Sequence, residues 1–311
     1  MKQKAKFILH LLFFSLHIAW ITATHNIFTH IYYWFILGLV SSCFNKRMSS
    51  QTTPLLHLSQ AHLNLLETCP RQFQHAYLEK LHSPSSPEHQ EHQVLGSRFH
   101  LLMQQREMGL PIASFLQADT RMQSWISGLT NVAPELLTPT TSLSFRESEH
   151  YRTLQIQNYL LTVIYDLLIA DADKAHILDW KTHPQPPNKR KLEQNWQTRL
   201  YLYVLGETSA YLPKNISMTY WFVQSEGEPQ NIQFNYDNPQ HQRTAQKLAQ
   251  LLNKLTHWLE GYQRNRPFPQ VPENSKTCNY CHFATLCQRT QARAEHQQNL
   301  PNLANIQEVT L

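Results

Sequence analysis

The fold is decided by residues 160–181, LLTVIYDLLIADADKAHILDWK. Two apolar runs, 160–169 and 175–181, flank a short polar turn, which predicts two strands of a β-hairpin. Each strand carries a carboxylate where a purely structural strand would prefer an apolar residue. We centre the turn on residues 172–173, and this register places Asp166 opposite Asp179, with Cβ atoms roughly 4.5–5.5 Å apart.

The second strand adds a lysine beside the two acids. Side chains alternate between strand faces with period two, so one face carries Ala175, Ile177, Asp179 and Lys181. Two carboxylates this close repel one another unless a cation lies between them, and a divalent ion is the natural candidate. A solvated hairpin end with a surface Asp–Lys pair is the alternative, and the hairpin alone does not decide between the two.

Composition restricts the function classes. The chain has 311 residues, 41% of them hydrophobic, with 17 Pro and only 7 Gly. No G-x-x-x-x-G-K-[ST] motif occurs, which excludes a P-loop motor in this sequence. The net charge of +5 comes entirely from five basic residues within positions 1–50, because the remainder holds 22 basic and 22 acidic residues. A polyanion site must therefore be local, and the candidates are 189–191, Arg264 with Arg266, and Arg289 with Arg293.

The domain organisation is predicted to have three parts: an apolar leader at 1–47, one domain at 48–295 and a polar tail at 296–311. The leader has two apolar runs, each shorter than the roughly 18–20 residues of a membrane span. One interpretation is a signal or membrane segment. The other is that translation begins at Met48 and that the residues before it result from an error in the assigned gene start. We favour Met48, and accordingly expect a cytoplasmic protein without a membrane partner.

The rest of the sequence alternates between helical and strand-like periodicity. A loop is expected at 82–92, where Pro, Ser and polar residues dominate. Helices are expected at 60–68, 71–81, 96–109, around 122–129, at 192–205 and at 240–263. Strands are expected at 143–147, 151–157, 160–169, 175–181, 216–223 and 232–236. This order predicts an α/β (mixed α+β) fold with one core.

Four cysteines outside the leader form a separate pattern. Cys278, Cys281 and Cys287 have C-x2-C-x5-C spacing, and Cys69 precedes them by more than 200 residues. This cysteine spacing is typical of a metal or cluster site. Four thiolates suit an iron–sulfur cluster, which we favour, or a structural zinc ion. Disulfides or inert buried thiols are the remaining alternatives, and His282 is an alternative ligand.

Taken together, the motifs resemble the PD-(D/E)XK nuclease superfamily, specifically the RecB-like branch with a four-cysteine iron–sulfur staple. This branch includes the AddB nuclease domain and the CRISPR-adaptation nucleases. The resemblance runs from about residue 58 to 290. The matching segments, in order, are Cys69-Pro70-Arg71-Gln72-Phe73, Gly96-Ser97-Arg98-Phe99-His100, Asp166, Asp179-Trp180-Lys181, Gln197-Thr198-Arg199-Leu200-Tyr201, and the three C-terminal cysteines.

The resemblance implies a restriction-endonuclease-like core, a mixed sheet flanked by helices. It also implies a Mg²⁺ or Mn²⁺ ion held by His100, Asp166 and Asp179, and a [4Fe-4S] cluster held by the four cysteines, with zinc as the less favoured occupant. Lys181 would position or deprotonate water, and Gln197 and Tyr201 would orient the phosphate or the strand.

The expected function is a metal-dependent DNA nuclease, of exonuclease type on single-stranded or frayed DNA, in DNA repair, recombination or CRISPR adaptation. DNA is the expected partner, together with a separate helicase subunit or a CRISPR integrase. The alternative is a non-catalytic DNA-binding or scaffold module that keeps the fold and the cysteine staple. Cleavage polarity, pathway and oligomeric state stay open.

Overall fold

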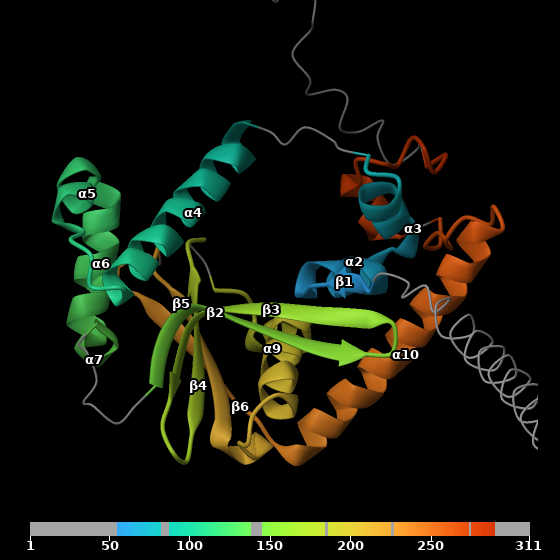
Figure 1. The fold of residues 1–311 in the computed structure, drawn as a ribbon. Helices are drawn as coiled ribbons and strands as arrows, with labels where there is room; N and C mark the ends of the chain where they lie inside the picture. The colour runs from blue at the N-terminus through green and yellow to red at the C-terminus, as the bar shows by residue number, and fades with distance from the viewer. Residues whose placement is uncertain are drawn as a thin grey trace, which may run out of the picture. The chain divides into compact units, whose positions relative to one another are not determined.

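The computed structural model describes residues 55–81, 87–137, 145–183, 186–224, 227–273 and 275–289 (Figure 1). These residues belong to one unit that begins at Leu55. The predictions for the leader at 1–47 and the tail at 296–311 lie outside the described residues. Within them, no helix has both the length and the apolar character that crossing a bilayer requires.

A six-stranded mixed sheet forms the centre of the unit, in the order β1-β3-β4-β5-β6, with β2 paired to β3. The β1–β3 and β4–β5 pairs are parallel, and the others are antiparallel. The strands are β1 (Leu56–Leu58), β2 (Phe145–Ile156), β3 (Tyr159–Ala170), β4 (Ala175–Lys181), β5 (Ile216–Phe222) and β6 (Gln230–Asn235). The expected mixed α/β class is confirmed.

The β3–β4 hairpin has the register that the sequence predicts. Its ladder runs from Ala170↔Ala175 to Leu167↔Leu178, so the next step places Asp166 across from Asp179. One edge of β3 pairs with β2 over its whole length. The other edge is shared, because β1 pairs with residues 159–161 and β4 with residues 167–170. Between these two ladders the sheet splits, and Asp166 lies at this split.

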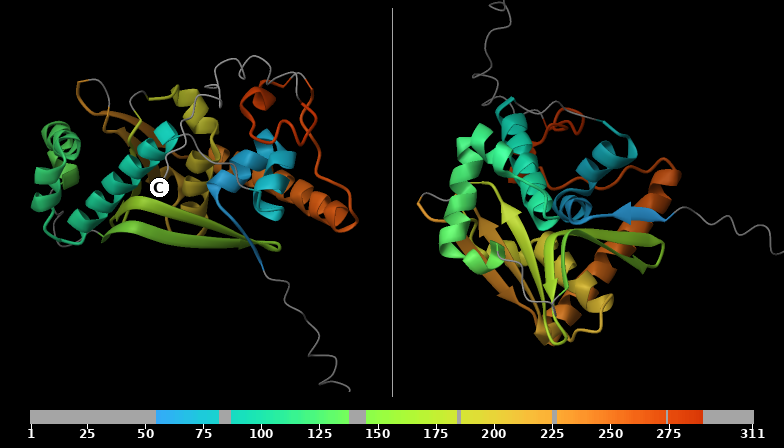
Figure 2. Two further views of the ribbon diagram at one scale, coloured as in Figure 1. Left: turned by 90° about the horizontal axis from the view of Figure 1, so that it is seen from above. Right: turned by 60° about the vertical axis from the view of Figure 1, so that its left-hand side comes forward.

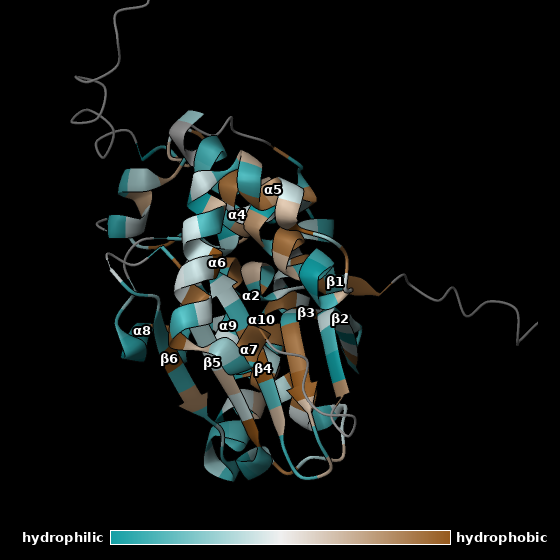
Figure 3. Cartoon of the chain, turned by 90° about the vertical axis from the view of Figure 1, so that its left-hand side faces the viewer, coloured by the Kyte–Doolittle hydropathy of each residue, from teal (hydrophilic) through white to brown (hydrophobic). Residues whose placement is uncertain are grey.

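Helices cover both faces of the sheet and define two cores. The first core packs strand residues such as Ile177 and Met218 against α2 (Gln60–Thr68), α9 (Trp196–Glu207) and α10 (Asn238–Gln263). The second packs Leu178 and Trp180 against α4 (Pro87–Glu107), α6 (Thr120–Val132) and α7 (Pro134–Leu137). Figure 3 shows hydrophobic residues (brown) concentrated in the strands between the two helical layers. Neighbouring residues of β4 thus enter different cores, as period-two alternation requires.

Several boundaries differ from the predicted ones. The helix predicted at 71–81 is a short α3 (Pro70–Phe73) followed by a π-helical turn (Gln74–Leu78). The loop predicted at 82–92 is wrong from Pro87 onward, where α4 begins. The strands predicted at 143–147 and 151–157 are one strand, β2. Further elements were not predicted: β1, α5 (Ala113–Ala118), α7 and η2 (Pro213–Asn215).

The helix predicted at 192–205 is divided at Asn195 into α8 (Lys189–Gln194) and α9. Asn195 has extended backbone angles, and its side-chain oxygen accepts a hydrogen bond from the Gln197 amide at 2.8 Å. This is an N-cap, which satisfies one of the free N–H groups of a helix start. Asn195 therefore starts α9 anew and places Gln197 in its first turn.

Candidate active site and cysteine site

The split between β3 and β4 brings the acidic residues together. The Asp166 Oδ2 atom accepts a hydrogen bond from the Trp180 backbone amide at 2.7 Å. This contact links the two strands where their ladder has ended. The Asp179 side chain is only 2% exposed and the Asp166 side chain 12%. A carboxylate pair is thus held at the edge of the core, where charge is costly without a compensating cation.

Lys181 and Gln197 hold Asp179 from two sides. The Gln197 amide donates to Asp179 Oδ1 at 2.6 Å and accepts from Lys181 Nζ at 3.1 Å. Lys181 Nζ also lies 2.5 Å from Asp179 Oδ2 as an ion pair, while that oxygen accepts no hydrogen bond in proper geometry. Gln197 reaches this position because it follows the Asn195 cap. The Lys181 ammonium is therefore fixed beside the acids.

Tyr201 is buried one turn after Gln197 on α9 and is 4% exposed. Its ring makes an edge contact with Tyr165, and its backbone carbonyl accepts the Tyr165 hydroxyl hydrogen bond at 3.0 Å. Burial raises the pKa of Tyr201 far above its ordinary value, and its hydroxyl interacts with the Gln197 side chain. Tyr201 thus supports Gln197 from the core as a neutral phenol, away from solvent.

His100 enters the site from the other helical layer. On α4, its Nδ1 atom lies 3.2 Å from Asp166 Oδ1. Gly96 precedes it by one turn on the same helix face. A Cβ atom at Gly96 would lie only 3.0 Å from Thr182 Oγ1, directly after the Asp179–Lys181 strand. The missing side chain therefore allows α4 to approach the end of β4, which brings His100 to Asp166.

Glu149 on β2 is a site residue that the sequence motifs do not predict. Ligand atoms of His100, Glu149 and Asp166 all lie within 4.8 Å of one another. Among the described residues, no other trio of His, Cys, Asp or Glu is grouped this closely. Glu149 has φ 52°, a left-handed backbone conformation that is unfavourable for residues with a side chain. The strain and the acidic cluster coincide, which is a common feature of functional sites.

The electrostatics of the site follow from burial and close acids. Burial alone would lower the pKa of His100, but its hydrogen bond to Asp166 and the charges of both aspartates raise it. Burial, and then the negative charge of Asp166, raise the pKa of Glu149. Burial raises the pKa of Asp179 to about 6, against the attraction of Lys181. The carboxylates are thus destabilised as anions, and a cation among them would relieve this.

These donors fit a divalent metal ion. Carboxylate oxygens with one imidazole match the preferences of Mg²⁺ or Mn²⁺ better than those of softer metals. The three groups nearest one another are His100, Glu149 and Asp166, whereas the sequence resemblance predicts His100, Asp166 and Asp179 as the ligands. Asp179 lies outside this trio and is engaged by Lys181 and Gln197, with its buried Oδ2 atom facing the Lys181 ammonium. The ligand set stays a prediction, and Glu149 joins it.

The four cysteines meet at a second site. One small cavity is lined by Cys69, Cys278, Cys281 and Cys287, and all four thiols are free. Figures 1 and 2 show the segment that carries the last three (red) beside α3, which Cys69 precedes. Burial raises the pKa of Cys281, and the neighbouring thiols Cys69 and Cys278 raise it further. Disulfides are not formed between them, and four convergent sulfurs fit a metal or cluster.

Four thiolates are the donor set of both a structural zinc ion and an iron–sulfur cluster. His282 is exposed, whereas the buried His75 lies nearby, with its Nε2 atom 3.8 Å from Cys287 Sγ.

The chain is similar to a known protein family and to solved structures. The model described as the PD-(D/E)XK nuclease superfamily matches residues 57–288. No curated protein matches the sequence. The solved structure of SSO0001 is similar at 14% identity with a TM-score of 0.33, covering 83% of this chain and 96% of that one. A Eubacterium rectale protein provisionally named an exonuclease is similar at 9% identity with a TM-score of 0.45, covering 78% and 96%.

Proposed function

The chain belongs to the PD-(D/E)XK nuclease superfamily, and we propose that it hydrolyses DNA phosphodiester bonds with the help of Mg²⁺ or Mn²⁺. Its mixed sheet, flanked by helices, is consistent with the restriction-endonuclease-like fold of that superfamily. One observation carries the proposal. At a split in the sheet, His100, Asp166 and Asp179 converge beside a fixed lysine, with Gln197 linking the lysine to Asp179.

The metal would be held by His100, Glu149 and Asp166, with Asp179 at the edge of the group. The support is the chemistry of these donors and their close spacing among raised-pKa carboxyl groups. A divalent ion supplies charge that offsets the negative phosphate and makes water more acidic. His100 binds a metal with its neutral imidazole, and the contact between its Nδ1 atom and Asp166 Oδ1 orients the ring beside the other ligands.

Lys181 is the residue that would act on the phosphate and the attacking water. Its ammonium is held between Asp179 Oδ2 and Gln197 Oε1, and its side chain is 22% exposed, so it can meet a substrate at the surface. A positive charge fixed in this way stabilises charge that develops on the phosphate oxygens without reorganisation. Gln197 is a positioning residue, and Tyr201 supports it from the core.

The four-cysteine site would hold a [4Fe-4S] cluster. Cys69 and the C-terminal cysteines are more than 200 residues apart in sequence, so a cluster would close a loop that spans most of the described unit. Closing so long a loop restricts the unfolded chain and stabilises the fold. The role is structural in this proposal, because none of the four cysteines lies within the group of His100, Glu149 and Asp166.

The finer assignment rests on the resemblance in sequence. It is exonuclease-type cleavage of single-stranded or frayed DNA in repair, recombination or CRISPR adaptation, by a cytoplasmic protein that works with a helicase subunit or a CRISPR integrase. Digestion of end-labelled single strands, blunt duplexes and closed circles tests it. An enzyme of this type cuts the linear single strand and spares the closed circle.

The decisive experiment compares metal-dependent cleavage by the wild type with that by Asp179→Ala and Lys181→Ala. Both variants should lose cleavage of a single-stranded substrate while keeping the wild-type circular dichroism spectrum. Lys174→Ala is the matched control, since Lys174 is an exposed lysine at the turn of the same hairpin. Cleavage by both site variants at the wild-type rate would overturn the assignment. A wild type that binds DNA but never cuts it would support the non-catalytic scaffold instead.

The cysteine site has its own test. An anaerobic preparation should contain about four iron and four sulfide per chain if a cubane cluster is bound. One zinc per chain, without sulfide, would overturn the cluster and leave the nuclease proposal untouched.

A further inference from the structure

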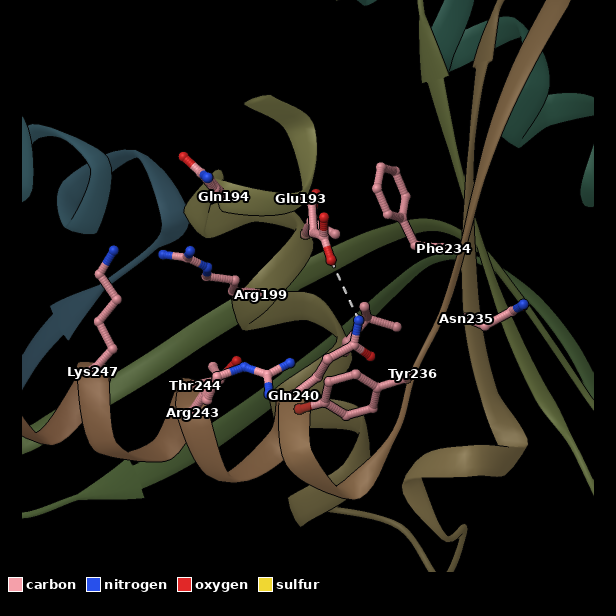
Figure 4. A pocket seen from close by; sticks show the side chains of 12 residues that line it. Glu193, Gln194, Arg199, Phe234, Asn235, Tyr236, Gln240, Arg243, Thr244 and Lys247 are labelled. Carbon is pink, nitrogen blue, oxygen red and sulfur yellow. Dashed lines mark hydrogen bonds between the residues drawn. The ribbon is translucent and has the colours of Figure 1, made fainter. Parts of the chain in front are cut away.

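A cavity between α9, β6 and α10 lies apart from both sites described above. We call it the α9–α10 pocket, and its lining includes Arg199, Phe234, Tyr236, Arg243, Thr244 and Lys247. Figure 4 shows Arg199 projecting from α9, and Arg243 and Lys247 from the facing surface of α10. None of these residues contacts the carboxylates of the active site by an interaction found in the described part of the chain. The pocket is thus a separate feature on the same layer of helices.

Three cations and one acid line the pocket, so its charge is positive and only partly balanced. The Arg199 Nη1 atom is buried without a hydrogen-bond partner. Among the described residues, Arg243 forms no ion pair or hydrogen bond, whereas Lys247 pairs with Glu67 at 2.5 Å. The acid that lines the pocket, Glu193, accepts a long hydrogen bond from Gln240 at 3.4 Å. A buried guanidinium nitrogen without an acceptor is unfavourable, and an anionic ligand in the pocket would supply acceptors for the unpaired donors of Arg199 and Arg243.

The basic run at 189–191 adds to this charge. The three residues form the exposed start of α8, whose last two residues line the pocket. Lys189 Nζ lies 5.5 Å from the centre of the Phe234 ring, at the pocket wall. Outside positions 1–50, basic and acidic residues are equal in number, so this grouping of cations is a local concentration. A polyanion site in this part of the chain has to be local, because there is no overall excess of basic residues, and this grouping is such a local site.

The lining selects phosphate over a nucleobase. Phe234 and Tyr236 are each 5% exposed, so neither ring offers a face for stacking. Guanidinium groups with free N–H donors match the oxygens of phosphate, and Arg199 and Arg243 bring two such groups to the lining. We infer that the α9–α10 pocket binds a phosphate group. If the proposed nuclease function holds, on which this step rests, the group is a backbone phosphate of a DNA strand.

Helix α9 connects this pocket to the active site. Gln197 and Arg199 are two residues apart, so they point about 200° apart around the helix axis. Gln197 holds Asp179 and Lys181 on one side of the first turn, and Arg199 lines the pocket on the other. A helix with its side chains is about 10–12 Å wide. A strand that leaves the active site around the start of α9 therefore meets the pocket within a few nucleotides.

The experiment measures binding of a labelled single-stranded oligonucleotide over a series of salt concentrations, in metal-free buffer that prevents cleavage. Each phosphate contact contributes about 0.7 to the slope of log K against log salt. The double variant Arg199→Gln/Arg243→Gln should lower that slope by about 1.4 and weaken binding at 0.1 M salt by about 25-fold. Lys254→Gln, an exposed lysine of α10 outside the pocket, should change neither value. Arg243→Gln alone, at an exposed position, guards against misfolding of the double variant.

A phosphate titration followed by phosphorus NMR separates a strand from the free ion. Loss of oligonucleotide affinity with the reduced slope supports the strand. Unchanged oligonucleotide binding with loss of inorganic phosphate binding assigns the pocket to free phosphate and overturns the strand. Unchanged binding of both overturns the pocket. A wild type that neither binds nor cuts DNA refutes the nuclease function, and the phosphate titration then still decides whether the pocket exists as a site.

Discussion

Glu149 faces Asp166 across the β2–β3 ladder, between the pairs Ser148↔Leu167 and His150↔Tyr165. Opposite residues of a ladder share a face, so the two carboxylates are held together by backbone register. Glu149 adopts φ 52° at this position. The sheet thus accepts both local backbone strain and repulsion between carboxylates, and both are understandable if the pair holds a cation.

This arrangement predicts that stability and metal binding oppose one another at Glu149. Glu149→Gly should raise the free energy of unfolding by about 0.5–1 kcal/mol, since left-handed backbone costs about 1–2 and the entropy of glycine returns part of this. The same variant should weaken Mn²⁺ binding by at least about tenfold. Denaturant unfolding and calorimetric titration measure the two effects.

Gln157→Gly is the matched control for Glu149→Gly. Gln157 is an exposed residue of the same hairpin with φ 55°. Its replacement should give the gain in stability without loss of Mn²⁺ affinity. Equal Mn²⁺ affinity of Glu149→Gly and the wild type would remove Glu149 from the ligand set.

The hairpin shows what sequence reasoning can achieve here. Alternation of apolar residues and a short turn sufficed to place Asp166 opposite Asp179, because register follows from the position of the turn. The same reasoning would have found Glu149. A turn at Gln157 and Asn158 fixes the β2–β3 register, but the polar run 145–156 predicts two short strands rather than one, and two short strands do not reveal the pairing with β3.

Other features depend on contacts that sequence periodicity does not contain. The α4 helix extends back to Pro87 through a segment rich in polar residues, where no apolar pattern marks it. His75 lies beside Cys287 because the π-helical turn after α3 and the C-terminal segment meet in space, over 200 residues apart in sequence. The α9–α10 pocket joins basic residues from separate helices, and each of them alone is an ordinary surface cation.

The close approach of Gly96 to Thr182 predicts that a larger residue at position 96 displaces His100. Gly96→Ala should reduce cleavage several-fold, because its Cβ atom would press on Thr182 Oγ1 and displace α4 by a few tenths of an ångström, with His100. Removing the obstructing atom in Gly96→Ala/Thr182→Ala should restore the rate. Ser97→Ala, at the exposed neighbouring position, controls for the general gain in helix propensity. Steady-state cleavage rates of the four proteins check this, and a double variant as slow as Gly96→Ala contradicts it.

The burial of His176 predicts how the free energy of unfolding depends on pH. Burial lowers the pKa of His176, whose Nδ1 atom lies 2.6 Å from Ser217 Oγ on the neighbouring strand. The unfolded chain therefore binds a proton more readily than the folded one, and stability falls as pH decreases below about 6.5, the ordinary histidine pKa. His176→Gln should flatten this decline between pH 7 and 5, as measured by urea unfolding. His257→Gln, at an exposed position of α10, should leave the decline unchanged. Parallel curves for His176→Gln and the wild type would show that His176 does not contribute.

The position of His75 leads to a prediction about how tightly the cysteine site holds its iron, which cleavage activity does not measure. Its Nε2 atom approaches Cys287 Sγ at 3.8 Å, and its Nδ1 atom lies 2.6 Å from Glu79 Oε2. Glu79 thereby orients the ring with Nε2 toward the sulfur, where the imidazolium form, with a proton on both nitrogens, donates an N–H to the thiolate. His75→Leu should keep the packing against Phe283 but lose this donor. Release of iron to a chelator, followed by absorbance, should then be about 10–100 times faster than in the wild type.

His282→Ala removes an exposed histidine next to Cys281 and should release iron at the wild-type rate. If the two variants exchanged behaviour, His282 would be the residue that serves the site, and the Glu79–His75 pair would be packing alone.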